Sequence, residues 1–274
     1  MQSEPIRTGL LVRWFVVAMY KVLTLKCIYP WLKRSGPVIF ISSRLCIKST
    51  PFTILAEAET MRFVSRNTTI PVPKVYCAFE HKGRGYIVME AIQGQSLWHG
   101  WVRRSQESKE KILLNLRLMI QQLHSLQPPD NVGVANVSGG PIYDQRLPKN
   151  PFWGPFPSIH AFHMKLCDGL GERHRETLPP DLQKLVEFYN QSWPRSTFTH
   201  GDLSSSNIVA RDDEIIGIVD WENAGWLPPY WEYTSAYNVN PLNQFWRKEV
   251  DGFLPSMPEA LEMESIRRKY FGDF

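Results

Sequence analysis

The clearest chemical signal in this sequence lies in two short segments, 198–207 and 218–222, which hold three oxygen-bearing side chains at fixed spacing. Asn207 follows Asp202 by five residues, and Asp220 follows Asp202 by 18 residues. This spacing is typical of a phosphoryl-transfer centre, in which a catalytic loop is followed by a carboxylate that binds metal. The residues therefore predict transfer of a phosphoryl group.

Phosphoryl transfer depends on positioning and on cations that neutralise the phosphate oxygens, which explains the residue types. Magnesium takes oxygen ligands and keeps several waters, so Asn207 and Asp220 suffice as its protein ligands. Asp202 is expected to accept the proton of the attacking hydroxyl or to orient that hydroxyl. His200 is expected to orient the catalytic loop through hydrogen bonds. ATP and Mg²⁺ are the predicted cofactors.

The stretch between Asn207 and Asp220 predicts a β-hairpin. Short β-branched runs at 208–210 and 215–219 flank the turn-forming residues 211–214. A hairpin would return Asp220 to the side of Asn207. Both expected metal ligands would then meet at one site.

These residues also carry a family resemblance. The segments 200–207, 218–226 and 229–233 resemble the aminoglycoside phosphotransferase and choline kinase-like superfamily, and within it the fungal phosphotransferase enzyme family group. The likeness extends from about Lys48 to the end of the chain. It does not imply that an antibiotic is the substrate.

The resemblance implies a fold and a domain organisation. An α+β, protein-kinase-like fold of two lobes is expected, with ATP in the cleft between them. Residues 1–94 would form the N-lobe around a small antiparallel sheet, and residues 95–274 would form a larger, mainly helical C-lobe. Apolar faces at helical spacing predict core helices in that C-lobe at 105–126 and 181–189.

A kinase-like site also requires a lysine that reaches the ATP phosphates from a strand. Lys48 follows two short apolar runs, 38–41 and 45–47, which predict a hairpin. Gly36 is the single glycine in the stretch just before Lys48, so no G-x-G-x-x-G loop can be assigned to the phosphates.

The lysine needs a glutamate partner on a helix. Residues 53–65 have helical periodicity, and Glu57 lies within the apolar stripe of that helix. A carboxylate that faces the interior is costly without a cationic partner, so we expect an ion pair between Glu57 and Lys48. Its place six residues before Phe63 also matches the family. Glu59 is the alternative partner.

The hinge between the lobes is expected after an apolar strand. The run 86–90 reads as a buried strand that ends at 91–94, where Gly94 relaxes the chain. An earlier run at 70–75 is joined to it through a turn at 83–85. In related kinases the backbone of the hinge strand receives the adenine. The matching positions here are Met89, Glu90 and Ile92.

The composition of the chain excludes several classes of protein. With 274 residues, 43% hydrophobic and 21% charged, it is an ordinary globular chain. Its net charge of +4 is spread through the sequence and predicts no nucleic-acid partner. Four cysteines without a C-x-x-C pair, and no evident secretory signal, predict reduced buried thiols and a cytoplasmic location.

An apolar N-terminal segment, 10–31, has three interpretations. Arg13, Lys21 and Lys26 interrupt it, and each would cost a few kcal/mol in the middle of a bilayer. We favour a helix packed on the small lobe over a basic amphipathic segment on a membrane surface, and over a spanning anchor.

The acceptor pocket has only weak signals. Aromatic residues are frequent in the Pro- and Gly-rich stretch 139–162, where they either wall a pocket or pin the loop to the lobe. Trp226, Trp231 and Tyr233 are candidates to stack on a substrate, and Glu232 to add charge selectivity. Aminoglycosides and choline both remain open as acceptor types.

Three functions compete at this point. The first is an ATP- and Mg²⁺-dependent phosphotransferase that acts on a hydroxyl of a small molecule. The second is a nucleotide-binding or scaffold protein of the same fold without catalysis, which the absent glycine motif suggests. The third is a protein kinase, disfavoured because no D-F-G, A-P-E or activation segment follows Asp220. The oligomeric state cannot be read from the sequence.

Overall fold

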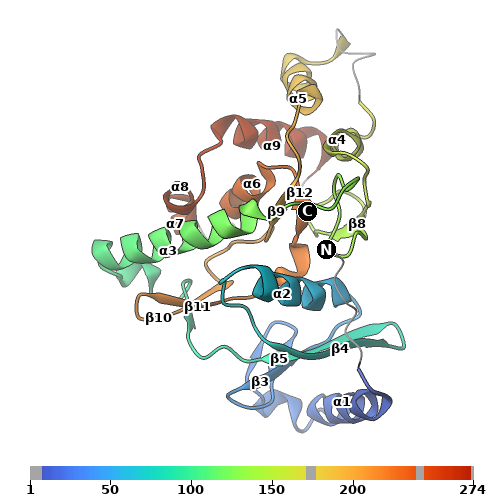
Figure 1. The fold of residues 1–274 in the computed structure, drawn as a ribbon, viewed down its shortest axis with the longest axis vertical. Helices are drawn as coiled ribbons and strands as arrows, with labels where there is room; N and C mark the ends of the chain where they lie inside the picture. Colours follow the sequence, from blue (N-terminus) through green and yellow to red (C-terminus); the bar gives the residue numbers. More distant parts are fainter. Residues whose placement is uncertain (1–7, 171–176, 239–243, 273–274) are drawn as a thin grey trace.

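The computed structural model describes residues 8–170, 177–238 and 244–272. They form a mixed α+β fold with an antiparallel sheet in the small N-terminal lobe and a mainly helical large lobe (Figure 1). The five strands of the small lobe are antiparallel and have the order β1-β2-β3-β5-β4. Their bounds are β1 Arg34–Ser35, β2 Val38–Phe40, β3 Leu45–Lys48, β4 Val75–His81 and β5 Arg84–Glu90.

Side chains of the sheet alternate between two covered faces, as the twofold period of a strand requires. Along β5, Ile87 and Met89 pack with the buried residues of helix α2 (Leu55–Asn67). Tyr86 and Val88 point to the other face, where helix α1 (Leu10–Leu23) covers the sheet. Figure 1 shows the sheet between these two helices. Strands covered on both faces read as continuous apolar runs, which is how residues 86–90 appear in the sequence.

Helix α1 packs on the small lobe, as the favoured interpretation expected, but it ends at Leu23 and covers only the first part of the segment 10–31. Val16 and Val17 are buried against the sheet, beside Ile39 and Phe79. Among the residues that the structure describes, no helix is long and apolar enough to cross a membrane.

Helix α2 begins two residues later than expected and ends two residues later. A turn precedes it, in which the Thr53 N–H donates to the Thr50 carbonyl and the Thr50 N–H donates to Thr53 Oγ1. The helix then continues through the polar residues Arg66 and Asn67, which the apolar stripe does not reveal. Boundaries of this kind depend on turns and caps more than on periodicity.

The large lobe is built around the long helix α3 (Gln106–Ser125), which was expected at 105–126. Ser105 caps it by accepting a hydrogen bond from the Ser108 N–H, and Pro128 and Pro129 follow its end. The other helices of this lobe are α4 Ile159–Leu166, α5 Pro180–Asn190, α6 Trp231–Asn238, α7 Gln244–Arg247, α8 Val250–Phe253 and α9 Pro258–Phe271.

Two strands that follow the catalytic loop form the predicted hairpin. β10 (Ile208–Arg211) pairs antiparallel with β11 (Glu214–Ile218), with Ile208 opposite Ile218. β6 (Gln95–Ser96) joins the outer side of β10. The two strands just outside the site, β9 (Thr197–Thr199) and β12 (Gly225–Leu227), pair with each other. The catalytic loop therefore leaves one small sheet and enters another.

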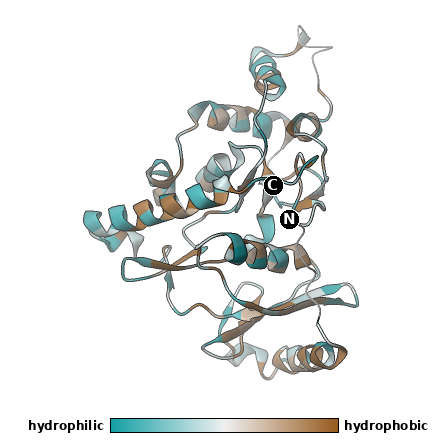
Figure 2. Cartoon of the chain, viewed as in Figure 1, coloured by the Kyte–Doolittle hydropathy of each residue, from teal (hydrophilic) through white to brown (hydrophobic). Residues whose placement is uncertain are grey.

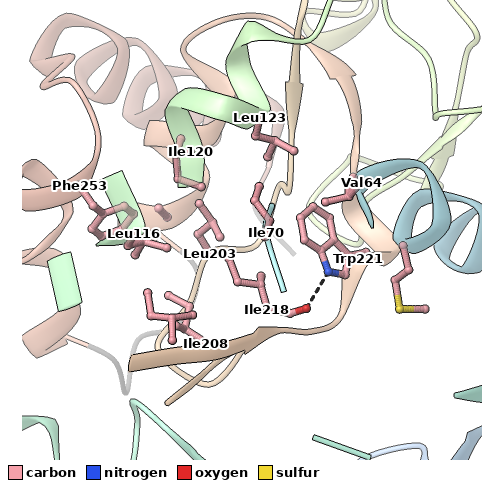
Figure 3. Packing of buried hydrophobic residues seen from close by; sticks show 14 of the residues in the cluster. Val64, Ile70, Leu116, Ile120, Leu123, Leu203, Ile208, Ile218, Trp221 and Phe253 are labelled. Carbon is pink, nitrogen blue, oxygen red and sulfur yellow. Dashed lines mark hydrogen bonds between the residues drawn. The ribbon is translucent and has the colours of Figure 1, made fainter. Parts of the chain in front are cut away.

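One apolar cluster connects the two lobes. Leu116, Ile120 and Leu123 of α3 pack with residues of the hairpin and with Val64 of α2 (Figure 3). The Trp221 indole lies in the same cluster and donates a 2.8 Å hydrogen bond to the Ile218 carbonyl. Because the core of a protein is close-packed, this cluster holds the hairpin in a fixed position relative to the small lobe.

The stretch 139–162 is not an unstructured loop. β7 (Ile142–Tyr143) pairs with β8 (Phe152–Trp153), and α4 begins at Ile159. Trp153 and Phe162 are buried in a second apolar cluster of the large lobe. Most aromatic side chains here attach the segment to the lobe. Of the two interpretations in the sequence analysis, this one describes them better than the wall of an acceptor pocket.

All four cysteines are free thiols. Cys46, Cys77 and Cys167 are buried as expected, whereas Cys27 is exposed. The expectation of a buried thiol was therefore wrong for Cys27, which follows the end of α1 on the surface.

Candidate active site

Lys48 lies where the two lobes meet, and three carboxylates surround its ammonium group. The distances from Lys48 Nζ are 2.9 Å to Glu57 Oε2, 2.7 Å to Asp220 Oδ1 and 2.8 Å to Glu222 Oε2. The predicted ion pair of Lys48 with Glu57 is thus present, and both residues are buried. Glu59, the alternative partner, accepts a hydrogen bond from Ser138 instead.

Strand and helix geometry bring the two residues of the pair together. Lys48 is the last residue of β3 and has the parity of Cys46, so its side chain lies on the face that α2 covers. Glu57 lies in the first turn of α2 and is itself buried, on the same face as Met61 four residues later. The carboxylate therefore faces the sheet at the level of the lysine.

Asp220 adopts an unusual backbone conformation, with φ 65° and ψ 61°. This left-handed region is uncommon for residues with a side chain, although Asp tolerates it better than most. A 3₁₀ turn at Trp221–Asn223 follows, and the Val219 N–H donates to the Asn207 carbonyl at 2.9 Å. The turn places Asp220 and Glu222, two residues apart, against the same ammonium group.

The charges of this cluster do not balance. Burial alone would lower the pKa of Lys48, but the three carboxylates outweigh it and raise that pKa well above its usual value. Burial raises the pKa of Glu57 to about 7, and burial also raises the pKa of Glu222, with the lysine opposing both shifts. Three carboxylates and one ammonium leave an excess of negative charge. Such an oxygen donor set suits a hard divalent cation.

Asp202 and Asn207 share the catalytic loop. The amide nitrogen of Asn207 donates to the Asp202 backbone carbonyl at 3.0 Å, so the amide oxygen remains as its acceptor. Asp202 Oδ1 is buried and has no hydrogen-bond partner among the described residues. Burial raises the pKa of Asp202 to about 6, and the nearby Arg146 guanidinium opposes that shift.

His200 holds the loop from inside. Its Nε2 lies 3.0 Å from the Val219 carbonyl, and its Nδ1 accepts the Asp202 N–H at 3.2 Å. Because the carbonyl needs a donor and the N–H needs an acceptor, the ring is neutral with its proton on Nε2. Burial lowers the pKa of His200 to about 4, which agrees with a neutral ring. The ring also contacts the Trp221 indole, with the centroids 4.4 Å apart.

Glu232 is part of the same loop support and not a surface for an acceptor, which corrects the sequence-based suggestion. Its buried carboxylate accepts the His200 N–H at 2.6 Å and the Gly201 N–H at 3.0 Å. Gly201 has φ +77°, and a Cβ there would lie 2.7 Å from the Asn223 carbonyl oxygen. Only glycine fits this turn without displacing the backbone.

A second ion pair, between the half-buried Arg146 and the buried Asp144, contacts the loop from the other side. The Arg146 guanidinium binds Asp144 through two hydrogen bonds of 2.8 Å and 2.6 Å. It also donates to the Gly201 carbonyl at 2.5 Å. Sequence reasoning missed both residues. Their one signal was a D-x-R pattern inside an aromatic-rich segment, where an ionic pair is unexpected.

The hinge positions lie at the end of β5. Cys46 and Leu45 of β3 pair with Met89 and Glu90, and the Glu90 N–H donates to the Lys74 carbonyl at 2.9 Å. The next N–H, of Ala91, donates to the Arg44 carbonyl. No hydrogen bond joins the Ile92 N–H to any residue in the described part of the chain.

The other aromatic candidates for an acceptor site lie in the core. Trp226, Trp231 and Tyr233 are all buried, and Trp226 packs with Phe198 inside the cluster that joins the lobes. The suggestion that these three side chains stack on a substrate was therefore wrong. Residues that follow Asp220 in the sequence need not lie beside it in space, because β12 and α6 turn back into the lobe.

Comparison with known proteins decides the family. The profile of the phosphotransferase enzyme family matches residues 44–262, which include every site residue described above. The chain belongs to this family. In two curated relatives, both named aminoglycoside 3'-phosphotransferase, the identity to this phosphotransferase-family chain is 24%. The match covers 72% of this chain and 68% of the Enterococcus faecalis protein, and 65% and 62% for the Staphylococcus aureus protein.

Solved structures of the family share the fold at low identity. A thermostable mutant of aminoglycoside phosphotransferase APH(4)-Ia superposes with a TM-score of 0.58 at 14% identity, covering 85% of this chain and 78% of that one. A further structure of that protein is a ternary complex with ADP and hygromycin B, with a TM-score of 0.58 at 14% identity over 86% of this chain and 82% of that chain. These similarities support the kinase-like two-lobed fold of the family member described here.

Proposed function

We propose that this chain is an ATP- and Mg²⁺-dependent phosphotransferase that acts on a hydroxyl of a small molecule. The observation that carries the proposal is the 2.7 Å contact of Lys48 Nζ with Asp220 Oδ1, which joins the small-lobe strand to the turn after the catalytic hairpin. Asp202 and Asn207 lie on the loop before that hairpin. This arrangement supports the proposed roles of Lys48 on phosphate, Asp220 on metal and Asp202 as base.

Each half of the site has a role for ATP. Residues 1–94 would hold the nucleotide from one side, with Lys48 on the phosphates and Glu57 orienting the lysine. The hinge would bind adenine through Met89, Glu90 and Ile92. Since neighbouring N–H groups are used by the sheet, the Ile92 N–H is the donor that the geometry offers. Residues 95–274 would supply the metal ligands, the base and the acceptor pocket.

The donor atoms fit magnesium. Asn207 offers an amide oxygen, and Asp220 offers a carboxylate that is part of an electronegative cluster. Glu222 adds a further carboxylate, which the sequence analysis did not select. When bound, Mg²⁺ would neutralise the charge of the β- and γ-phosphate oxygens.

Asp202 would act on the acceptor. Its raised pKa, near 6, makes it a better proton acceptor than an exposed aspartate while it stays ionised at neutral pH. The acceptor hydroxyl gives its proton to the Asp202 carboxylate, its oxygen bonds to the γ-phosphorus, and the bond to the β–γ bridging oxygen breaks. ADP and a phosphate monoester are the products. His200 holds the loop and takes no proton.

Two alternatives are less well supported. A protein kinase needs an activation segment after its metal carboxylate, but here Asp220 is followed by one 3₁₀ turn and then β12. A protein without catalysis would have no need to hold Asp202 with a buried, unpartnered oxygen beside an Arg–Asp pair.

The relatives named for aminoglycosides make small polyhydroxylated amines a reasonable first class of acceptor.

The test is an assay of ADP release against a panel of small alcohols, amino sugars and choline. Asp202→Ala should abolish turnover and leave nucleotide affinity nearly unchanged, whereas Asp220→Ala should weaken Mg²⁺-dependent nucleotide binding. Glu214→Ala, an exposed carboxylate at the start of β11, is the matched control and should behave as the natural chain. Equal turnover in Asp202→Ala and the natural chain would refute the proposal.

A further inference from the structure

Helix α1 carries an apolar outer face as well as an apolar inner one. Leu11, Trp14, Phe15 and Val22 are 86%, 64%, 68% and 51% exposed. Their spacing of three, four and seven residues puts them on one stripe, opposite the buried Val16 and Val17. A surface helix of a water-soluble domain normally turns polar residues outward. Something apolar is therefore expected to cover this stripe.

The position of the stripe limits what can cover it. Figure 2 shows α1 as a mostly hydrophobic helix at the end of the small lobe, on the far side of the sheet from the large lobe. Trp31, beyond the helix, is 87% exposed and belongs to the same N-terminal segment. The 14-residue helix is about 21 Å long, which is shorter than the roughly 30 Å of a bilayer core. It can lie on a membrane but cannot cross one.

The charge around the helix is one-sided. Residues 8–47 contain six basic residues and no acidic one, so with a total of +4 the remainder of the chain sums to 4 − 6 = −2. The charge is thus concentrated in the N-terminal segment, which corrects the impression of an even spread. Among the described residues, no carboxylate forms an ion pair with Lys21, Lys26, Lys33 or Arg34.

These observations favour one partner over the others. A second copy of the chain would bring two basic segments together, which costs free energy. An anionic phospholipid surface offers both an apolar layer for the stripe and phosphates for the basic side chains. We propose that α1 binds the surface of an anionic phospholipid bilayer, with Trp14 and Phe15 inserted among the lipids and the basic residues at headgroup level.

Membrane binding in this orientation leaves the active site free. Lys48 points to the face of the sheet that α2 covers, whereas α1 lies on the opposite face. The bilayer would therefore contact the small lobe from behind. An enzyme held in this way can act on an acceptor that is itself near a membrane or in solution.

The test is flotation of the full chain with vesicles of phosphatidylcholine alone, or of phosphatidylcholine mixed with phosphatidylserine. The natural chain should float with the mixed vesicles, stay behind with the neutral ones, and be released by high salt. Trp14→Glu/Phe15→Glu should lower the vesicle affinity at least about 100-fold, because two large apolar side chains are lost to the lipid. Lys21→Ala should lower it roughly fivefold.

Controls separate this proposal from the enzymatic one. Leu118→Glu changes an exposed apolar residue of α3 and should float normally, as should Asp202→Ala, whose turnover the proposed function expects to be lost. Circular dichroism of the α1 variants should match that of the natural chain, because the changed side chains point to solvent. Leu11→Gln/Phe15→Gln is a second double variant of the apolar stripe, and it removes apolar side chains without adding negative charge.

Two results would overturn the proposal. One is a natural chain that does not float with anionic vesicles at low salt. The other is an α1 double variant that floats as well as the natural chain. Light scattering would identify a different partner. If the natural chain is a dimer that Trp14→Glu/Phe15→Glu dissociates, and if the natural chain binds no vesicles, then a second copy covers the stripe.

Discussion

Arg146 acts on the catalytic loop through a single backbone carbonyl, that of Gly201, while Asp144 holds its guanidinium in place. Gly201 directly precedes Asp202, so the position of the Asp202 carboxylate depends on this contact. A planar guanidinium makes both sets of bonds at once, and a lysine ammonium cannot reproduce that fork. Under the proposed function, Arg146 is therefore a positioning residue for Asp202.

Arg146→Lys should lower kcat by roughly 10- to 100-fold, because small displacements of a catalytic group are costly, with a much smaller change in KM. Arg146→Ala should also lower the free energy of unfolding by about 3–5 kcal/mol, since it leaves Asp144 buried without its partner. Kinetics and urea denaturation measure the two effects. Loss of stability with unchanged kcat in the lysine variant would assign Arg146 to the fold alone.

The titration of Asp202 gives a pH dependence with a definite sign. Burial raises its pKa to about 6, so the carboxylate is ionised and able to accept a proton above this value. Turnover at saturating ATP and Mg²⁺ should fall as the pH drops through this value, by at least roughly tenfold per pH unit well below pH 6. His200, whose pKa burial lowers to about 4, should not change the slope of the pH–rate profile in this range. A rate that stays constant down to pH 5 would contradict the assignment of Asp202 as the base.

Residue types alone revealed part of the site and missed the rest. The ion pair of Lys48 with Glu57 was predicted correctly because a buried carboxylate needs a partner, whereas the roles of Asp202 and Asn207 stay predictions from their spacing. Arg146 escaped because its contact with Gly201 spans 55 residues along the chain, and no local pattern encodes it. Pairings of this length depend on how whole elements pack.

At the scale of elements, α6 supports the catalytic loop. Glu232, in the first turn of this helix, accepts two backbone N–H groups of the loop. The loop is thereby tied to α6 through Glu232 and to the turn after β11 through His200. These two attachments explain how the loop can hold Asp202 in place although its own residues form no strand pairing.

Glu232→Gln keeps one acceptor oxygen but turns an amide NH₂ toward a backbone N–H. One of the two hydrogen bonds is lost in a buried place, so the free energy of unfolding should fall by about 1–3 kcal/mol. Thermal or urea denaturation checks this value, with the exposed Glu259→Gln of α9 as the matched control. A variant as stable as the natural chain would mean that the two short contacts contribute nothing.

Elements were predicted better than their ends and their orientation. The β10–β11 hairpin, the α3 helix and the strand at 86–90 all have periodicity or turn signals strong enough to be read directly. The start of α2 shifted because a threonine turn delays it. The aromatic residues of β12 and α6 were misplaced because sequence shows that they are apolar but not which side they face.

For the whole molecule, the cluster around Lys48 is a charged contact among the polar contacts between the lobes. It joins a strand and a helix of the small lobe to the turn at Asp220 and Glu222. Without the ammonium, three carboxylates would face one another in a partly buried place. The relative position of the lobes thus depends on the same charges that would bind Mg²⁺ and ATP.

Lys48→Met keeps much of the side-chain volume but removes that charge. The free energy of unfolding should fall by about 3–5 kcal/mol, as for other buried ion pairs that lose one partner. Added Mg²⁺ should restore part of the lost stability, because it would bind in the folded state the carboxylates that no longer pair with the lysine. Denaturation with and without Mg²⁺ measures this, and Lys184→Met, in an exposed ion pair on α5, should change stability by less than about 1 kcal/mol. Equal stability of Lys48→Met and the natural chain would contradict the role of the cluster.

The central claim is that Lys48, Asn207 and Asp220 form one site for ATP and Mg²⁺. Isothermal titration calorimetry of ATP into the natural chain, with Mg²⁺ and then with EDTA, tests it most directly. Saturable heat should appear with Mg²⁺, and should fall sharply with EDTA and in Asp220→Ala. Absence of heat with Mg²⁺, or the same binding curve in Asp220→Ala, would contradict the account.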